Sequence, residues 1–513
     1  MTRLFRPVRH VLPALAGAAL VAVFALIGTQ AAQAADEEPG FKSLFNGKDL
    51  SGWDGNPKFW SVKDGTITGQ TTAENPTKGN TFLTWRDGTV DDFELRLSYK
   101  IVGNNSGIQY RSQEFGDWVV GGYQGDFEAG DTYSGILYEE RGRGILALRG
   151  QKTEVGPDGK VHVVESLGDT KDIQSAIKKE DWNDYVILAR GNELTHIING
   201  RKTIQVVDNQ PEKRAMSGVL ALQLHAGPPM TVQFKNIRIK RTRLTAGTKK
   251  IVMVAGRPSH GRGDHEFNAG TKLLKKCLDK LPGVLAVQYG GGWPSDPSAF
   301  DNADAILFYM DGGDGHPLIQ GDHLIQINKL VKQGVGIACA HYAVEIPKDR
   351  GGPELLDWIG GYFEANWSVN PYWTAKFDKL PEHPITRGVK PFEINDEWYY
   401  HMRFRKDMDH VTPILTAIPP ASTLDRPDGP HSGNPTVRSK LGQPQHVAWA
   451  VEREDGGRGF GFTGGHFHRN WGDDNFRKLF LNSLLWVAKS EVPAAGVNCP
   501  VSPEDLQENL DPK

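Results

Sequence analysis

The spacing of apolar residues divides the chain into two parts with different periods. From Phe41 to about Arg243, apolar and polar residues alternate in short runs that Gly, Asn and Asp separate. Residues 92–101 (DFELRLSYKI) show the alternation most clearly, with Phe93 and Leu95 on one face. Period-two alternation is typical of strands with one buried face, and many short strands without helices between them predict a sandwich or barrel. We therefore expect an all-β domain over residues 41–243.

Turn residues refine this all-β prediction. Residues 181–207 (DWNDYVILARGNELTHIINGRKTIQVV) contain three strand patterns, separated by Gly191-Asn192 and Asn199-Gly200. Asn-Gly between two strand patterns is a hairpin signal. The last strand pattern, residues 230–241, changes phase between Phe234 and Ile237, which predicts a β-bulge.

From Lys249 onward, buried strands alternate with amphipathic helices. Strands are predicted at residues 250–256, 304–310 and 335–341, and helices near residues 273–281 and 322–334. This rhythm predicts a parallel sheet covered on both faces. Residues 446–465 are typical of a late hairpin, and residues 475–489 of a closing helix. We expect an α/β domain over residues 249–489 and a loosely held, Pro-rich tail over 490–513.

The first residues follow the pattern of an export signal. Arg3, Arg6 and Arg9 precede an apolar run over residues 12–28, and Ala32-Gln33-Ala34 is a small-x-small cleavage site. We expect cleavage after Ala34, so that residues 1–34 are a signal peptide and the protein is periplasmic or secreted. The alternative is an uncleaved anchor, but a spanning helix usually needs about 20 apolar residues. No cysteine follows the run, which excludes a lipid anchor at that site.

Charge and cysteine content narrow the range of partners. The net charge is −3, from 59 basic and 62 acidic residues, and the two signs are interspersed. We therefore expect no nucleic-acid partner and no stable membrane insertion after cleavage. The three cysteines are too few for a disulfide scaffold, their odd number argues against a fully paired set, and their spacing matches no zinc motif.

Three strand patterns of the first domain carry polar residues at every second position. The alternating residues are Gln109 and Arg111, Gln124 and Asp126, and Gln223 and His225. Side chains two residues apart share a face of a strand, so neighbouring strands would assemble amide, guanidinium, carboxylate and imidazole groups into one patch. Such a mixture suits the hydroxyls of a sugar. The alternative is a solvated outer face, but those favour Lys, Glu, Thr and Ser, which this set lacks.

Several segments of the first domain resemble the 3-keto-disaccharide hydrolase family. They are GFKSLFNGKDLSGW (40–53), NNSGIQYR (104–111), GGYQGDFEAG (121–130), YSGILYEERGRGIL (133–146) and GVLALQLHAGPP (218–229). The resemblance implies a concanavalin-A-like (laminin-G-like) sandwich. It also implies cleavage of glycosides that carry a ketone at carbon 3.

That chemistry limits the roles to be filled. The ketone acidifies the hydrogen on carbon 2, so a base can remove it and the group on carbon 1 can leave, after which water adds. The reaction needs a base, a group that stabilises the enolate and an acid for the leaving oxygen. We expect His225 or Glu139 as base or acid, and Arg111 or Arg143 beside the enolate. The residues expected to hold the sugar are Gln109, Gln124, Asp126, Glu140 and Gln223. The alternative source of positive charge is a divalent cation on Asp126, Glu139 and His225.

The second domain resembles the trehalose-utilisation (ThuA-like) family. The matching segments include KIVMVAGRPSHGRGDHEFNAG (250–270), KQGVGIACAHYA (332–343) and GRGFGFTGGH (457–466). The implied fold is that of class I glutamine amidotransferases, an α/β flavodoxin-like arrangement. His341 occupies the position of the reactive cysteine of those enzymes, and Cys339 falls two residues earlier, inside the strand. We therefore expect no amidotransferase activity.

Polar residues gather at the predicted strand ends of the second domain, where open α/β sheets place ligands. They are His260, His265, Glu266, His341, Glu345, Asp396, Glu397, Tyr399, His401, His466 and His468. Each histidine taken singly is more often structural. Together they predict a carbohydrate pocket in a sugar-binding, isomerase-like or hydrolase domain. His466-x-His468 and His265-Glu266 offer metal ligands, although neither matches a named metal motif.

The whole chain is therefore predicted to be an exported carbohydrate-active enzyme with a small carbohydrate as substrate. The main alternative is a non-catalytic glycan-binding protein, because laminin-G-like sandwiches also serve as binding domains. A plain glucan hydrolase is disfavoured, since the chain lacks a strand motif of the E-x-D-x-x-E type.

Overall fold

The structure is a computed structural model that describes residues 39–512. The predicted signal peptide, residues 1–34, lies outside the described residues. Among the residues that are described, no helix combines the length and the apolar character needed to cross a membrane.

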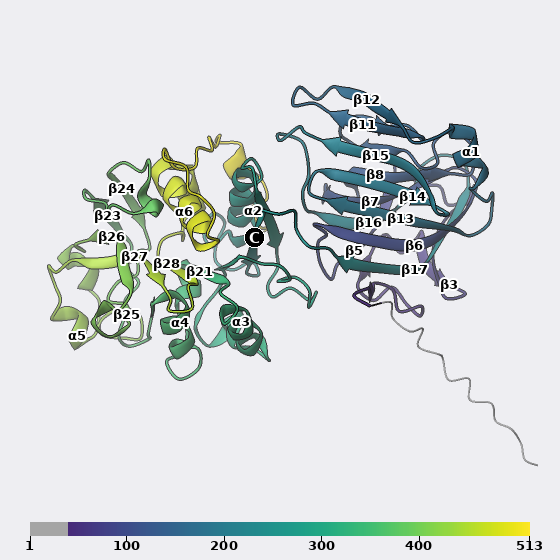
Figure 1. The fold of residues 1–513 in the computed structure, drawn as a ribbon. Coiled ribbons are helices and arrows are strands. Elements are labelled where there is room, and N and C mark those ends of the chain that lie inside the picture. The colour runs from purple at the N-terminus through teal and green to yellow at the C-terminus, as the bar shows by residue number, and fades with distance from the viewer. Residues whose placement is uncertain (1–38, 513) are drawn as a thin grey trace, which may run out of the picture. The chain divides into compact units, whose positions relative to one another are not determined.

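Two sheets face each other in the first part of the chain (Figure 1). In spatial order, the larger sheet contains β12 (Val161–Ser166), β11 (Gln151–Val155), β15 (Arg201–Asp208), β14 (Glu193–Ile198), β13 (Asn183–Arg190), β6 (Phe93–Val102), β17 (Met230–Arg241), β4 (Thr66–Thr71) and β3 (Trp60–Lys63), and β1 (Lys42–Ser43) pairs with β17. The smaller sheet contains β10 (Gly144–Ala147), β9 (Leu137–Glu140), β8 (Val120–Glu128), β7 (Asn105–Glu114), β16 (Val219–Leu224), β5 (Thr81–Trp85) and β2 (Trp53–Asp54). The domain predicted to be all-β is mostly β-sheet. A single short helix, α1 (Thr170–Ser175), is the only α-helix described before residue 249.

Both predicted hairpins and the predicted bulge are present. Arg190 pairs with Glu193 across Gly191-Asn192, and Ile198 pairs with Arg201 across Asn199-Gly200. Asn199 and Gly200 both have positive φ, as the tightest hairpin turns require. The register of β17 against β6 shifts between Lys235 and Arg238, which restores the inward direction of the apolar residues after the change of phase.

The core of the sandwich consists of the inward residues of both sheets. Leu95 of β6 and Ile187 of β13 meet Ile108 of β7 and Tyr123 and Phe127 of β8, and all five are essentially inaccessible to solvent. Burial of each such side chain contributes about 1.5–3 kcal/mol. The opposite faces of β7, β8 and β16 are therefore free to carry polar residues.

The second part of the chain is built on one seven-stranded sheet. Its order is β19 (Val284–Tyr289), β18 (Lys249–Ala255), β20 (Ala305–Tyr309), β21 (Gly336–Ala340), β28 (Arg458–Phe462), β27 (Gln445–Glu452) and β26 (Val411–Ala417). The first five strands are parallel, and the last two continue the sheet as antiparallel strands. Two small sheets, β22 (Gly361–Tyr362) with β25 (Arg403–Phe404) and β23 (Trp373–Phe377) with β24 (Phe392–Asp396), are inserted between β21 and β26.

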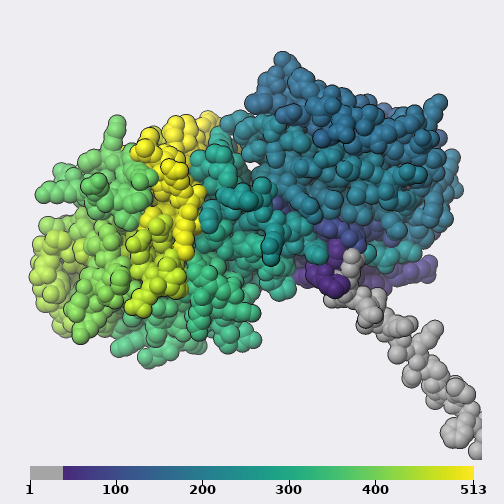
Figure 2. Space-filling view, in the orientation of Figure 1, coloured from purple at the N-terminus to yellow at the C-terminus, as the bar shows by residue number. Residues whose placement is uncertain are grey.

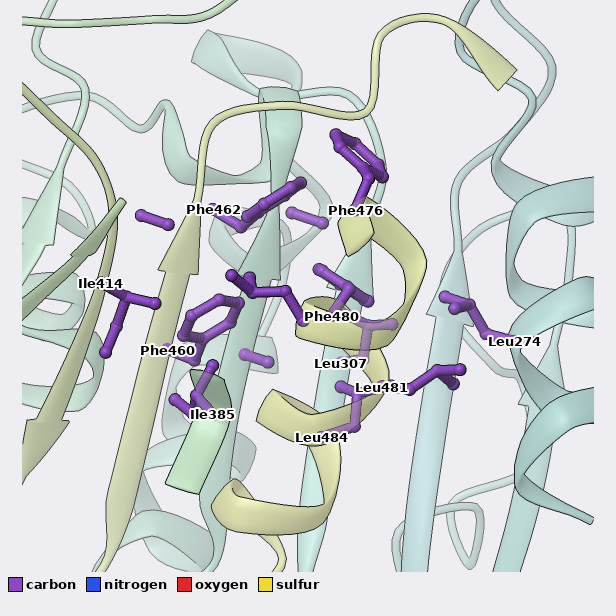
Figure 3. Close-up of a cluster of buried hydrophobic side chains, with 14 of the residues drawn as sticks. Leu274, Leu307, Ile385, Ile414, Phe460, Phe462, Phe476, Phe480, Leu481 and Leu484 are labelled. Carbon is purple, nitrogen blue, oxygen red and sulfur yellow. The ribbon is translucent and has the colours of Figure 1, made fainter. Parts of the chain in front are cut away.

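Helices cover both faces of this sheet, as the buried strands require. α2 (Phe267–Leu278) and α6 (Asp474–Val487) pack on one face, and α3 (His323–Val331) and α4 (Gly352–Ile359) on the other. The short helix α5 (Pro435–Arg438) lies in the loop before β27. In Figure 3, Phe476 and Phe480 of α6 lie against Phe460 and Phe462 of β28.

The residues after Glu491 are fixed to the domain, so the prediction of a loosely held tail is wrong. Val492 and Val497 are buried in the same core as α6, and Cys499 forms a disulfide with Cys277 of α2 at a Cα–Cα distance of 5.5 Å. In Figure 2 these C-terminal residues, in yellow, lie along the surface of the second domain. The two buried valines and the disulfide hold this C-terminal segment in place, although its apolar residues follow no regular spacing. Cys339 remains unpaired and buried, which agrees with the odd cysteine count.

Candidate functional sites

The alternating polar residues of the first domain do come together, because β8, β7 and β16 are neighbours. Gln109 lies opposite Gln124 in the register of β7 and β8. Gln109 Nε2 donates to Gln124 Oε1 (2.8 Å), and Gln124 Nε2 donates to Asp126 Oδ1 (3.1 Å). Ser112 Oγ donates to Gln109 Oε1 (2.7 Å). We call the set Gln109, Gln124, Asp126, Glu140, Gln223 and His225 the polar face.

Glu140 and Gln223 form the second part of the polar face. Gln223 Nε2 donates to Glu140 Oε2 (3.3 Å), and Asn80, just before β5, donates to Glu140 Oε1 (3.4 Å). Gln223 Oε1 is buried and has no hydrogen-bond partner among the described residues. A buried acceptor of this kind is costly unless a ligand satisfies it. His225 Nδ1 lies 2.5 Å from the carbonyl oxygen of Ala226, so Nδ1 carries the hydrogen and Nε2 is the basic nitrogen.

Burial raises the pKa of two carboxyl groups of the polar face. Burial raises the pKa of Asp126 to about 8, although hydrogen bonds from Asn105 and Gln124 act in the opposite direction. Burial also raises the pKa of Glu140, against the hydrogen bond from Asn80 and the nearby charge of His225. The polar face thus combines an acid that holds its proton near neutral pH with an imidazole base.

Arg111 does not lie on the polar face, contrary to the alternation expected from sequence. The register of β7 against β8 shifts after Tyr110, and Arg111 has a φ of 49°. Its buried guanidinium donates to Asp92 Oδ1 (2.8 Å) and to the carbonyl oxygens of Asp91 and Gly191. The bulge turns this side chain toward the opposite sheet, where it forms a buried ion pair.

Glu139 and Arg143 also lie apart from the polar face. Adjacent residues of a strand point to opposite faces, so Glu139 is on the core side of β9 when Glu140 is on the outer side. Arg143 donates to both carboxylate oxygens of Glu139 (2.7 and 2.8 Å) and to Asp208 Oδ2 (2.6 Å). The expected cation on Asp126, Glu139 and His225 therefore lacks a common site, and these residues form no metal-binding group in the described part of the chain.

In the second domain, four predicted residues converge on one point. His265 Nε2 lies 3.0 Å from His341 Nε2 and 3.1 Å from His466 Nδ1, and the latter two atoms are 3.3 Å apart. Glu397 Oε2 lies 3.1 Å from His466 Nδ1 and 3.5 Å from His341 Nε2. All four side chains are buried. We call His265, His341, His466 and Glu397 the histidine cluster.

The topology of the sheet explains this convergence. His341 directly follows β21, and His466 follows β28, its neighbour in the sheet. His265 lies between β18 and α2, and Glu397 directly follows β24. The carboxyl ends of the parallel strands meet at one edge, which is the usual place for ligands in such sheets. His265 and His341 have φ of 49° and 53°, and backbone conformations of this rare kind gather at functional sites.

Other groups orient the cluster. His341 Nδ1 lies 3.0 Å from the carbonyl oxygen of Thr463, and His265 Nδ1 lies 3.1 Å from Asp311 Oδ1. Asp396 accepts the backbone N–H groups of Gly465 (2.8 Å) and His466 (3.1 Å). Burial, reinforced by the neighbouring histidines, lowers the pKa of His341 well below its ordinary value.

The remaining predicted residues of the second domain surround the cluster without joining its centre. The hydroxyl of Tyr399 lies 3.3 Å from His341 Nε2, and the ring of His260, an exposed residue, lies against that of His265 at a tilt of 35°. Glu266 accepts the backbone N–H groups of Gly263 and Asp511. Glu345 pairs with His431 at 2.8 Å.

Three further predictions concern His401, His468 and Cys339, which do not belong to the histidine cluster. His401 stacks on Trp367, and His468 is buried outside the cluster. Cys339 is a core residue of β21, as predicted, and burial raises the pKa of its thiol.

Sequence reasoning missed several neighbours of the two sites. Asn80 and Asn105 contact the carboxylates of the polar face, and Asn370 and Tyr372 contact Glu397 and His466. Asp311 follows β20 almost directly, so the strand-end rule that found His341 could have found it. The asparagines and Tyr372 lie in loops or at a strand start and carry no such signal.

Two family models match successive parts of the chain. Residues 40–240 match the model of the 3-keto-alpha-glucoside-1,2-lyase-like domain, and residues 264–487 match the model of the trehalose utilisation (ThuA) family. Both predicted resemblances are confirmed, in the predicted order. They indicate a carbohydrate-related function. No curated protein matches the chain.

Solved structures give only distant likenesses. A proposed glycosyl hydrolase from Parabacteroides distasonis is 21% identical, with a TM-score of 0.28 over 39% of this chain and 99% of its own. The carbohydrate-binding module CBM66 from Bacillus subtilis is 16% identical, with a TM-score of 0.26 over 37% of this chain and 95% of its own. A proposed ThuA-like protein from Bacteroides uniformis is 16% identical, with a TM-score of 0.35 over 48% of this chain and 94% of its own. These values carry no functional argument.

Proposed function

We propose that the first domain cleaves 3-keto-glycosides by removal of the carbon-2 proton, elimination of the carbon-1 substituent and addition of water. The observation that carries this proposal is the polar face, where an acid of raised pKa, an imidazole base and a buried acceptor without a partner occur together. The second domain would bind or process a related sugar on a flavodoxin-like sheet. The order β19-β18-β20-β21-β28 of its parallel strands agrees with that arrangement.

The described contacts favour particular roles. His225 Nε2 is the base for the carbon-2 hydrogen, because its Nδ1 is already engaged with a carbonyl oxygen. Asp126 is the acid that protonates the leaving oxygen, because burial keeps its carboxyl protonated near neutral pH. Glu139 takes no part in the proposed reaction, since Arg143 donates to both of its oxygens. Glu140 is the carboxyl group of this strand that we expect to contact the sugar.

The developing enolate needs a hydrogen-bond donor on the polar face. Arg111 and Arg143 are engaged in buried ion pairs away from it. The amide of Gln223 is our candidate for this donor. Its Nε2 carries two hydrogens and donates to Glu140, and its Oε1 can accept from a sugar hydroxyl.

The test is to incubate the protein with a 3-keto-disaccharide and with its unoxidised parent, and to follow the products by mass spectrometry. Release of keto-sugar from the oxidised substrate alone is expected, and His225→Ala should lower turnover by about 10²–10⁴-fold. His162→Ala, on an exposed strand of the other sheet, is the matched control.

Binding of both sugars without any product would contradict the enzymatic proposal and favour the glycan-binding alternative. Export to the periplasm or medium remains a prediction from residues 1–34, and cell fractionation tests it.

A further inference from the structure

One ring nitrogen of each histidine in the cluster faces a nitrogen of the other two. A carbonyl oxygen can only accept a hydrogen bond, so His341 Nδ1, 3.0 Å from the oxygen of Thr463, carries the ring hydrogen. The carboxylate of Asp311 fixes the hydrogen of His265 on Nδ1 in the same way. When both rings are neutral, their Nε2 atoms carry lone pairs, and these atoms lie only 3.0 Å apart. Two lone pairs at this distance repel each other unless a positive centre lies between them.

The spacing of the four ligand atoms matches the coordination shell of a small ion. Bonds of about 2.0–2.1 Å to a tetrahedral ion place neighbouring ligand atoms about 3.4 Å apart. Five of the six separations run from 3.0 Å, between His265 and His341, to 3.5 Å, between His341 and Glu397, and all six lie within 4.8 Å. A single ion at the centre of the cluster would account for all of these short separations at once.

The charge and chemistry of the cluster select the kind of ion. As metal ligands, the three imidazoles and the carboxylate offer nitrogen and oxygen donors with one negative charge. Imidazole suits Zn²⁺, Fe²⁺, Co²⁺ and Ni²⁺, whereas Mg²⁺ and Ca²⁺ prefer oxygen ligands. Glu397 is also fixed, because its second oxygen accepts a hydrogen bond from Asn370 (3.1 Å).

The surroundings resemble those of established metal centres in general. Ligating histidines usually donate their other ring hydrogen to a carboxylate or a carbonyl, as His265 and His341 do. Tyr372 is 56% exposed and its hydroxyl lies 3.2 Å from His466 Nε2, so the cluster lies directly beneath the surface and an ion can reach it.

We propose that His265, His341, His466 and Glu397 bind one divalent transition-metal ion at the carboxyl edge of the second domain's sheet. This site is separate from the polar face and does not depend on the activity proposed for the first domain. It gives the second domain a Lewis acid beside Tyr399, whose hydroxyl lies 3.3 Å from His341 Nε2. Because four protein ligands complete a tetrahedral shell, a hydroxyl or carbonyl oxygen of a sugar or keto-sugar would bind the ion only as a fifth ligand.

The experiment measures metal binding directly, without any sugar. The full chain is stripped with a chelator, dialysed against Zn²⁺ or Co²⁺, and analysed for bound metal per chain by mass spectrometry of the elements. We expect one equivalent, and for Co²⁺ a visible absorption band from nitrogen and oxygen ligation. His341→Ala and Glu397→Gln should each weaken binding by about 100-fold or more, beyond the range seen when only supporting residues are lost.

His410→Ala is the matched control, because that histidine belongs to the same domain and its side chain is 53% exposed. Circular dichroism checks that each variant folds, and Glu397→Gln changes only one atom of its side chain if His341→Ala fails to fold. Absence of bound metal in the unsubstituted chain, or equal binding in the two cluster variants and the control, would overturn the proposal.

Discussion

The polar face and the histidine cluster use similar residue types but are assembled in different ways. The polar face arises from alternation along three neighbouring strands, so its side chains stand side by side and hydrogen-bond to one another. The histidine cluster arises at strand ends, where residues 265, 341, 397 and 466 are brought together by the sheet. In the first, the carboxylate and amide oxygens accept hydrogen bonds from neighbouring side chains, except Gln223 Oε1. In the second, ring nitrogens of three histidines and one carboxylate oxygen lie close together.

This difference indicates what each site is suited to bind. Amides and protonated carboxyls offer both donors and acceptors, as neutral hydroxyl groups require. Converging lone pairs with a carboxylate require a cation. Fold alone would not have separated the two cases, because both sites lie where their architectures commonly place ligands.

The largest expected effect distinguishes Glu140, on the outer face of β9, from Glu139, on its core face. Glu140→Gln should lower kcat/KM for a 3-keto-disaccharide by about 10–100-fold while the protein stays folded, because it removes a charged hydrogen-bond partner of the sugar from the polar face. Glu139→Gln should instead lower the free energy of unfolding by about 1.5–3 kcal/mol, because it removes charged hydrogen bonds to Arg143. Turnover and urea unfolding of both variants provide the measurement. The reverse assignment of effects would place the chemistry on the core side of β9.

The next effect concerns the second site alone. Cys277 lies in α2, the helix that begins two residues after His265, and its bond to Cys499 closes a separation of 222 residues. Cys277→Ser should lower the free energy of unfolding of the second domain by about 2–5 kcal/mol. It should also weaken metal binding while leaving turnover at the polar face unchanged. Thermal unfolding, metal content and turnover, compared with Cys339→Ser as a second cysteine variant, would reveal any coupling.

The smallest effect is a pH dependence of the first site. The pKa of Asp126 is about 8, so its acid form is lost above that pH and kcat/KM should fall about tenfold per pH unit. Asp126→Asn should be slower at neutral pH and should show no break near pH 8. A profile of kcat/KM from pH 5 to 10 tests this, and an unshifted break in the variant would assign the titration to another group.

The same shift has a consequence for stability. Because the pKa of Asp126 is higher in the folded chain than in the unfolded one, the folded chain binds more protons between about pH 4 and pH 8. The contribution of this group to stability is therefore fully present below about pH 4 and is lost as the pH rises through about 8.

Period-two alternation was sufficient to predict the sandwich, its hairpins and most of the polar face. It failed at Arg111, because a bulge after Tyr110 changes the direction of one side chain, and nothing in the local sequence marks that bulge. It could have separated Glu139 from Glu140, since neighbours on a strand must face opposite sides. The resemblance to a family favoured the whole acidic run and obscured that distinction.

Strand ends likewise identified the four residues of the histidine cluster, but within a list of eleven. Selecting among them requires the order of strands and the directions of loops, which depend on contacts between distant segments. The segment after Glu491 was predicted wrongly because its few apolar residues follow no period. Its attachment depends on surfaces of α2 and α6 that no local pattern describes.

The attachment of that segment sets the order in which the second site can be completed during synthesis. The backbone N–H of Asp511 donates to Glu266, the residue after His265, and Cys499 is bonded to the helix that follows. A ribosome delivers residues 499 and 511 more than 220 residues after the loop that they fasten. Cys277 therefore cannot form its disulfide with Cys499 until most of the domain has been synthesised. A chain that ended between residues 467 and 498 would retain all four cluster residues but lack the contacts that hold the loop of His265.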